Sequence, residues 1–389
     1  MMKWLTTPGC LALALLLSAC NTNLVTTTSY TPLEQQNINA ESTRELLDVG
    51  IVPLDPGLDK ADENETLLPD LRKAESQFLA HQISLTVQNS AAWGAVRVIP
   101  GTTTVTDVYV EGTILESNGK TLELEVRVSD SSGRHWYTET YSETVGKYAY
   151  ERRQRGRDPF QGVFNRIAND LMRFHEQLPE SRSAELRTIS ELRFARDFSP
   201  QAFDRHIAED KNGQLTVASL PAENDSILQR VRPIRERDYL YIDTMQEHYQ
   251  TFSKRMNKPY QDWRATSYDD IIAIEKLRKS SINRGIIGGL AIVGGILAAG
   301  SDNGSSQLGG LVAAGAGGVL LKDALGRRQE AQTHVDALVE LGSSLEVDIE
   351  PQVIDLEDRT ITLTGNVETQ YEEWKKLLQQ IYEQERGLE

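Results

Sequence analysis

The side chains best suited to chemistry are few in this sequence. It contains six histidines and two cysteines among 389 residues. No two histidines stand three or four positions apart, which is the spacing that places two imidazoles around one zinc ion on a helix. We find no Gly-x-Ser-x-Gly elbow and no Walker phosphate-binding loop. The sequence therefore predicts a protein that is not an enzyme and that uses no metal or cofactor.

One thiol, that of Cys20, stands in a distinctive context. The chain begins with a short basic start at Lys3, continues with an apolar run over residues 11–17, and reaches Cys20 after Ser18 and Ala19. This order is typical of a secretory signal. The apolar run is much shorter than the ~20 residues that a membrane-spanning helix needs. We expect cleavage directly before Cys20, although an ordinary secreted protein with a chance cysteine at the cut site is the alternative.

Residues 17–20, Leu-Ser-Ala-Cys, resemble the lipobox of bacterial lipoproteins. The resemblance implies that residues 1–19 are a signal peptide, that the Cys20 thiol carries a diacylglycerol, and that the new amino terminus is acylated, for example with palmitate. In that family an aspartate after the cysteine retains the protein in the inner membrane. This chain has Asn21 there, so we expect an outer-membrane location facing the periplasm. Each buried acyl CH2 contributes about 0.8 kcal/mol to such an anchor.

Composition narrows the possible partners. Cys10 would leave with the signal peptide, so no intrachain disulfide can form in the mature protein. The formal net charge of −16 disfavours nucleic acid as a partner. The basic run at 152–157 is predicted to be a solvated helix start or loop, with a lipid or peptidoglycan phosphate contact as the alternative. We expect outer-membrane lipid and either a second copy or an envelope-complex protein as partners, and no small-molecule substrate.

The sequence predicts an α+β protein whose parts differ in composition. After the signal peptide we expect a flexible tether at 20–40, an α/β domain at 41–150, a helical region at 151–284, a glycine-rich apolar helical hairpin at 285–322 and a small α/β domain at 323–389. The tether assignment depends on a Thr/Asn/Ser/Gln-rich composition without an apolar period.

Residues 41–150 are expected to form an α/β sandwich of the order β-α-β-β-β-β, with one solvated sheet face. Strands are predicted at 49–54, 95–100, 107–114, 121–128 and 136–141, and a helix at 71–89 has Leu71, Ala74, Phe78, His81, Gln82 and Leu85 on one face and polar residues opposite. Hairpin turns are predicted at 117–120 and 131–134. Asn118 and Gly119 are expected to supply the positive φ angles of a type I′ turn.

The segment from Asp107 to Glu143 resembles the curli-secretion-channel lipoprotein superfamily and the amino-terminal domain of the Tol-system propeller protein. The matching positions are Tyr109, Gly112, Ile114, Arg127, Asp130 and Gly133. The resemblance covers about a quarter of the chain and concerns the fold. It implies a helix packed on a sheet and a role as an assembly or docking module.

The region 151–284 carries helical patterns. Phe160, Phe164, Ile167 and Leu171 recur at helical spacing and predict an amphipathic helix. Further helices are predicted around 184–196, 239–255 and 268–278, and a short strand is possible within 212–222. We expect these helices to pack on the first domain or on each other.

The segment 285–322 is the most unusual part of the chain. Residues 285–300 contain no charge, and residues 309–321 are again uncharged and rich in glycine and alanine. Small residues four apart allow two helices to approach closely. The predicted membrane or oligomer hairpin contains Gly285, Gly289, Gly295, Gly309, Gly310, Gly317 and Gly318. Membrane insertion, a buried homo-oligomer interface and a mobile linker are the three interpretations.

The C-terminal part is predicted to be a small αββα module. Its elements are a helix at 331–341, strands at 345–349 and 359–367, and a helix at 374–382 with Trp374, Leu378, Ile381 and Tyr382 inward. The segment from Arg359 to Ile381 resembles the core of BON domains, which are envelope modules linked to membrane or phospholipid contact.

These patterns together favour a lipid-anchored structural or assembly protein of an envelope or secretion complex, which oligomerises through its α/β domain and its glycine-rich hairpin. One alternative is an outer-membrane pore or export-channel subunit whose hairpin crosses the membrane. Another is a monomeric periplasmic binding module.

Overall fold

The computed structural model describes residues 30–36, 45–59, 69–151, 157–283, 336–337, 340, 352–355, 360–364 and 366–387. Cys20 and the glycine-rich segment 285–322 lie outside these ranges, as does the strand predicted at 345–349. What the sequence predicts for them stays a prediction. The fold is α+β, as the sequence predicts.

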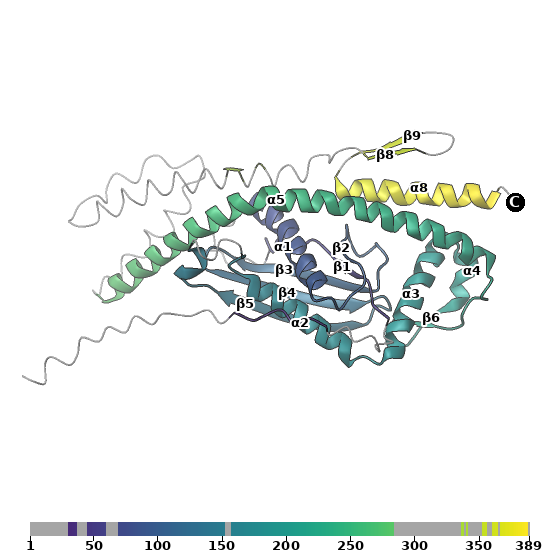
Figure 1. Cartoon of the computed structure of the whole chain (residues 1–389), viewed down its shortest axis with the longest axis horizontal. Coiled ribbons are helices and arrows are strands. Elements are labelled where there is room, and N and C mark those ends of the chain that lie inside the picture. The colour runs from purple at the N-terminus through teal and green to yellow at the C-terminus, as the bar shows by residue number, and fades with distance from the viewer. Residues whose placement is uncertain are drawn as a thin grey trace, which may run out of the picture.

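A five-stranded mixed sheet forms the centre of the molecule, in the order β2-β1-β3-β4-β5 (Figure 1). The strands are β1 (Val49–Ile51), β2 (Val96–Val98), β3 (Val108–Ser117), β4 (Thr121–Asp130) and β5 (His135–Thr144). β1 is parallel to both neighbours, whereas β3, β4 and β5 form an antiparallel meander. The predicted order β-α-β-β-β-β is confirmed.

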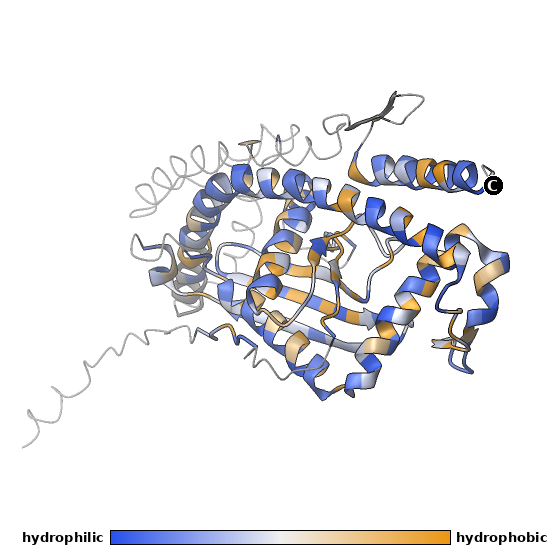
Figure 2. Ribbon diagram, turned by 45° about the vertical axis from the view of Figure 1, so that its right-hand side comes forward, coloured by the Kyte–Doolittle hydropathy of each residue, from blue (hydrophilic) through white to orange (hydrophobic). Residues whose placement is uncertain are grey.

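One face of the sheet is covered by helices. α1 (Pro69–Asn89) and α2 (Gln161–Gln177) pack against each other and against the strands. Along β4 the alternate residues Leu122, Leu124, Val126 and Val128 are completely buried, while Arg127 between them is exposed. This alternation confirms that one face of the meander contacts the core and the other contacts solvent. Hydrophobic residues accordingly recur along the strands of the sheet and along the helices that cover it (Figure 2).

α1 differs from its prediction because it is covered on several sides. Besides the sheet and α2, it contacts α5, so the face opposite the sheet is not solvated. Arg72 and Glu75 are therefore buried, with relative exposures of 4% and 0%. Leu85, which was expected to lie on the buried face, is instead exposed.

Short elements connect the sheet to the helical region. The 3-10 helix η1 (Lys147–Tyr150) follows β5. The predicted apolar stripe is fully buried; it begins at Phe160, directly before α2, and continues within α2. After α2 come α3 (Glu180–Phe198), α4 (Pro200–Phe203), η3 (Asp204–His206), β6 (Ile207–Glu209) and β7 (Leu215–Val217). β6 and β7 form a small antiparallel pair, which confirms a strand within 212–222.

α5 (Ser226–Asn283) is one helix of 58 residues where the sequence predicted two separate helices. The residues between the two predicted segments continue the buried pattern through Met256, Tyr260 and Trp263. α5 contains Pro233 and Pro259, and it arches over the body from the α3–α4 end past the sheet (Figure 1). At 1.5 Å per residue its contour is about 87 Å long.

The C-terminal part contains β8 (Gln352–Asp355), β9 (Thr360–Leu363) and α8 (Val367–Gly387). β8 and β9 pair antiparallel, and the sequence did not predict β8. α8 packs on α5, and the four residues predicted to face inward, Trp374, Leu378, Ile381 and Tyr382, are all buried. The same hydrophobic cluster contains residues of the sheet, α5 and α8.

The turn between β3 and β4 is not the predicted type I′ turn. Among the described residues, positive φ angles occur at Ala91 and at three glycines, and Asn118 and Gly119 are not among them. Gly119 is needed for a different reason. A Cβ built on Gly119 would lie 2.0 Å from the carbonyl oxygen of Arg264 and 2.4 Å from the amide nitrogen of Tyr268. The turn therefore touches the backbone of α5, and only a residue without a side chain fits there.

Candidate functional site

Residues 30–36, which we name the strap, lie against α2 although the sequence predicted a flexible tether over the whole of 20–40. The Nδ2 atom of Asn165 donates hydrogen bonds to the hydroxyl of Tyr30 (2.9 Å) and to the carbonyl of Thr31 (2.8 Å). The guanidinium of Arg173 contacts both carboxylate oxygens of Glu34, with Nε at 3.1 Å. The strap is therefore part of the folded body.

Asn169 is the middle partner of the strap. Its Nδ2 donates to the carbonyl of Pro32 (3.0 Å), and its Oδ1 accepts from the amide of Glu34 (2.9 Å). Asn165, Asn169 and Arg173 follow each other at intervals of four, which places them on one face of α2. Asn165 and Asn169 are each 1% exposed, so the strap provides the partners that two buried amides require.

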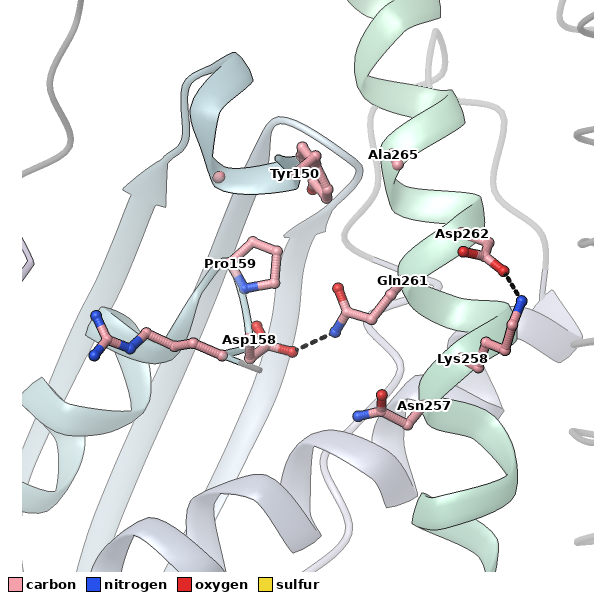
Figure 3. A pocket seen from close by; sticks show the side chains of 10 residues that line it. Tyr150, Asp158, Pro159, Asn257, Lys258, Gln261, Asp262 and Ala265 are labelled. Atoms are coloured by element: carbon pink, nitrogen blue, oxygen red, sulfur yellow. Dashed lines mark hydrogen bonds and ion pairs between the residues drawn. The ribbon is translucent and has the colours of Figure 1, made fainter. Parts of the chain in front are cut away.

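A cavity of about 450 Å³ opens beside the place where the strap begins (Figure 3). Its walls come from α5 and from the segment after β5: Ala149, Tyr150, Arg157, Asp158, Pro159, Asn257, Lys258, Gln261, Asp262 and Ala265. The guanidinium of Arg157 lies 4.3 Å from the ring centroid of Tyr30, so the cavity and the strap share a side chain contact. Such a cation–π contact stabilises by about 0.5–1 kcal/mol at an exposed site.

The carboxylates of this cavity already have partners. Gln261 donates to Asp158 at 2.8 Å, and the ammonium of Lys258 forms an ion pair with Asp262 (Figure 3). Arg264, directly behind the cavity, contacts both oxygens of Asp158 at 3.2 and 3.0 Å. The guanidinium of Arg264 thereby balances the negative charge of the Asp158 carboxylate and holds it in place.

A buried polar network extends from Arg264 into the core. Arg264 donates to the hydroxyl of Tyr260 (2.7 Å), which in turn donates to Oε1 of Glu75 (2.7 Å). The hydroxyl of Ser117 donates to the same oxygen (2.7 Å). Burial alone would lower the pKa of Arg264, but the neighbouring Tyr260 and Asp158 raise it above its usual value. The network joins α1, β3 and α5 around a permanently charged guanidinium.

A second cavity, of about 600 Å³, lies between β5 and α2 and is lined in part by Tyr141, Asp170 and Phe174. The hydroxyl of Tyr141 donates to Asp170 at 3.1 Å, and burial raises the pKa of this tyrosine above its usual value. A phenol of raised pKa stays protonated at neutral pH, so Tyr141 serves as a hydrogen-bond donor and not as a base.

The described histidines are dispersed. Burial and the charge of Lys254 lower the pKa of His81 to about 4, so this imidazole is neutral at physiological pH. His175 packs against the ring of Trp93, and His206 contacts Ser219 through Nδ1. Within the described ranges no three His, Cys, Asp or Glu side chains are grouped so that they could hold a metal ion. No helix among those residues is both long and apolar enough to cross a membrane.

The residues of the curli-channel resemblance have structural roles here. Asp130 accepts hydrogen bonds from the amide of Ser132 (2.9 Å) and from the indole of Trp136 (2.8 Å), and it thereby closes the turn between β4 and β5. Gly133 in that turn has a φ of 81°. Gly112 lies where a Cβ would meet the carbonyl of Glu125 at 2.8 Å.

The remaining three positions of the resemblance also belong to the fold. Ile114 is buried, Arg127 lies on the solvent face, and the hydroxyl of Tyr109 donates to the carbonyl of Thr104 at 3.0 Å. None of the six residues lines either cavity.

No known protein family, curated protein sequence or solved structure matches the chain.

The sequence analysis missed both the strap and the Arg264 network. Asn165, Asn169 and Arg173 stand at helical spacing on a face that the amphipathic pattern assigns to solvent, so repeated asparagines there were the available signal. Arg264 has no such signal. An arginine within a charged helix is usually exposed, and its burial depends on tertiary contacts.

Proposed function

We propose that the protein is a lipid-anchored outer-membrane protein with a structural or assembly role in an envelope or secretion complex, and that it is not an enzyme. The observation that carries the proposal is the segment Leu17-Ser18-Ala19-Cys20 after a short apolar run, followed by Asn21. The described fold is consistent with such a role, because the buried side chains of Asn169, Tyr260 and Arg264 hold the strap, the sheet and α5 together.

Metabolic labelling with a clickable palmitate analogue tests the anchor. The parent and a Cys10→Ser variant are expected to incorporate label and to fractionate with outer membranes, because Cys10 belongs to the segment that is removed. A Cys20→Ser variant should lose both the label and the membrane association. Equal labelling and sorting of the Cys20→Ser variant would refute the proposed anchor.

A second substitution tests the destination. By the rule that the lipobox resemblance implies, Asn21→Asp should retain the labelled protein in the inner membrane, whereas Asn21→Gln should leave it in the outer membrane. Density-gradient fractionation distinguishes the two. If both variants sort like the parent, the outer-membrane assignment loses its support.

We further infer that the glycine ladders within 285–322 join copies of the chain or contact lipid. Sedimentation of detergent-extracted protein should show a smaller assembly after deletion of residues 285–321. Replacement of Gly309 and Gly317 by leucine should have the same effect, because close helix contact requires small residues. An unchanged sedimentation coefficient in both variants would contradict the joining of copies through this segment. Conductance of protein-bearing liposomes would instead favour the pore alternative.

A further inference from the structure

The strap determines which part of the body lies nearest to the anchor. Tyr30 is held by Asn165 and by the guanidinium of Arg157, which lines the cavity between α5 and the segment after β5. Cys20 precedes Tyr30 by ten residues, and an extended chain of that length spans at most about 35 Å. A lipid attached to Cys20 therefore keeps the cavity within about 35 Å of the membrane surface.

The C-terminal end of α5, after which the glycine-rich segment follows in the sequence, lies on the same side of the body. The rings of Tyr150 and Tyr268 lie 5.6 Å apart, and Lys120 forms an ion pair with Glu275. These contacts hold the last third of α5 against η1 and the β3–β4 turn, beside the cavity that Tyr150 lines. α5 then extends past the sheet to Asn283, two residues before the glycine-rich segment begins (Figure 1).

Positive charge gathers around this cavity, although the chain as a whole carries a net charge of −16. Lys258 lines the cavity, is 86% exposed and forms an ion pair with Asp262 of the same wall. Lys254 lies one helical turn before it on α5, and Arg255 is adjacent; both are exposed and form no ion pair with any other residue of the described ranges. The two carboxylates of the cavity are balanced, Asp158 by Arg264 and Asp262 by Lys258. Because charges interact over only about 8 Å at physiological ionic strength, Lys254 and Arg255 contribute more at a contacting surface than acidic residues elsewhere on the chain.

An exposed aromatic side chain completes this surface. Tyr148 in η1 is 59% exposed, stands next to the exposed Lys147 and adjoins Ala149 of the cavity wall. Tyrosine is favoured at membrane–water interfaces, since its ring is apolar and its hydroxyl remains hydrated.

We propose that this cationic face, made of Lys147, Tyr148, Arg157, Lys254, Arg255 and Lys258, contacts the anionic phospholipid headgroups of the membrane that holds the anchor. The inference rests on the proposed function, because the lipid on Cys20 brings the face to the membrane. Each basic residue near an anionic surface contributes a factor of about five in affinity. The contact orients the body and presents the opposite end, with α3, α4, β6 and β7, to partners in the periplasm.

Vesicle binding by unlipidated protein tests the cationic face independently of the anchor. The probe is the mature chain with Cys20→Ser, mixed with vesicles of phosphatidylcholine alone or with added phosphatidylglycerol. The test variant carries Lys254→Gln, Arg255→Gln and Lys258→Gln. The matched control carries Lys211→Gln, Lys376→Gln and Arg386→Gln, which removes three exposed cations from the β6–β7 turn and α8. Thermal unfolding of both variants verifies that the fold is retained.

The parent should bind the anionic vesicles more tightly than the neutral ones, and added salt should weaken the binding. The test variant should lose about tenfold or more in affinity for the anionic vesicles, and the control should lose less than about twofold. If the parent does not prefer anionic vesicles, or if the control loses as much as the test variant, the proposed face is wrong. Because the protein in this assay carries no lipid, its outcome is independent of the palmitate labelling of Cys20.

Discussion

The indole nitrogen of Trp374 donates a 3.2 Å hydrogen bond to Oδ1 of Asp238, and this contact fixes the C-terminal helix on the first quarter of α5. The hydroxyl of Tyr371 donates to the other oxygen of Asp238 at 3.3 Å. The ring of Trp374 also stacks on that of Tyr241, with centroids 4.7 Å apart. Asp238 is 2% exposed, so α8 is attached through a buried carboxylate.

The burial of Asp238 predicts that the free energy of unfolding depends on pH. Burial raises the pKa of Asp238 to about 6, from a usual value near 4. The folded protein therefore holds a proton on Asp238 that the unfolded chain has released, and the resulting stabilisation is complete below about pH 4 and is lost as the pH rises through 6. Asp238→Asn should raise the free energy of unfolding at pH 7.5 by up to about 3 kcal/mol.

Urea denaturation followed by circular dichroism measures this effect. The advantage of Asp238→Asn should shrink between pH 7 and pH 4 as the parent carboxylate becomes protonated. Glu247→Gln, at an exposed position of α5, is the control and should show no such gain. A variant that is less stable than the parent at pH 7.5 would mean that the charge itself holds α8 in place.

The contact between Gly119 and α5 predicts a steric effect. Gly119→Ala would bring a methyl group against the backbone of Arg264 and Tyr268, and neither backbone can rotate away. We expect a loss of about 1–3 kcal/mol in the free energy of unfolding, typical of an overpacked site. Gly101→Ala is the matched control, because a Cβ there would meet nothing within 4 Å. Equal unfolding midpoints for the two variants would show that the turn and α5 are not in contact.

The Arg264 network predicts that substitutions within it have non-additive effects on the free energy of unfolding. Arg264→Met would leave the carboxylate of Asp158, whose side chain is 6% exposed, without its cation and should cost about 3–5 kcal/mol. The double variant with Asp158→Asn should recover part of that loss, since the unpaired charge is then absent. Denaturation of the two single variants and the double variant gives the interaction energy. A purely additive cycle would argue against a direct pairing of the two side chains.

The strap predicts a change in protease sensitivity. Asn165→Ala together with Asn169→Ala removes the donors that hold Tyr30, Thr31 and Pro32, so Glu34 should become cleavable by a glutamate-specific protease. Cleavage at Glu34 should accelerate about tenfold or more, while the rest of the fold remains intact. Gln177→Ala, an exposed change on the same helix, should leave the rate unchanged. Rapid cleavage at Glu34 in the parent would show that the strap is not docked.

The sheet and its covering helix could be predicted because the residue pattern that indicates each element lies within that element. Alternating residues in β4 and the apolar stripe of α2 identify these elements without reference to the rest of the chain. The motif at Cys20 is local in the same sense, since it depends on four adjacent residues.

What the sequence did not reveal depends on distant contacts. Glu34 meets Asn169 across 135 positions, and only that meeting distinguishes a docked strap from a polar tether. The role of Gly119 likewise depends on where α5 passes, so the sequence alone indicates only a glycine that suits a turn. Arg264 looks solvent-exposed in a charged helix until the network around Tyr260 and Asp158 encloses it.

The long separations also determine how this chain can fold. Arg97 contacts Asp243 across 146 positions, and Asp238 contacts Trp374 across 136. Closing loops of that length costs conformational entropy before the stabilising contacts can form. Proteins dominated by such contacts therefore fold slowly. A nascent chain therefore cannot complete its core until α8 has emerged, and until then its apolar strands are exposed to aggregation.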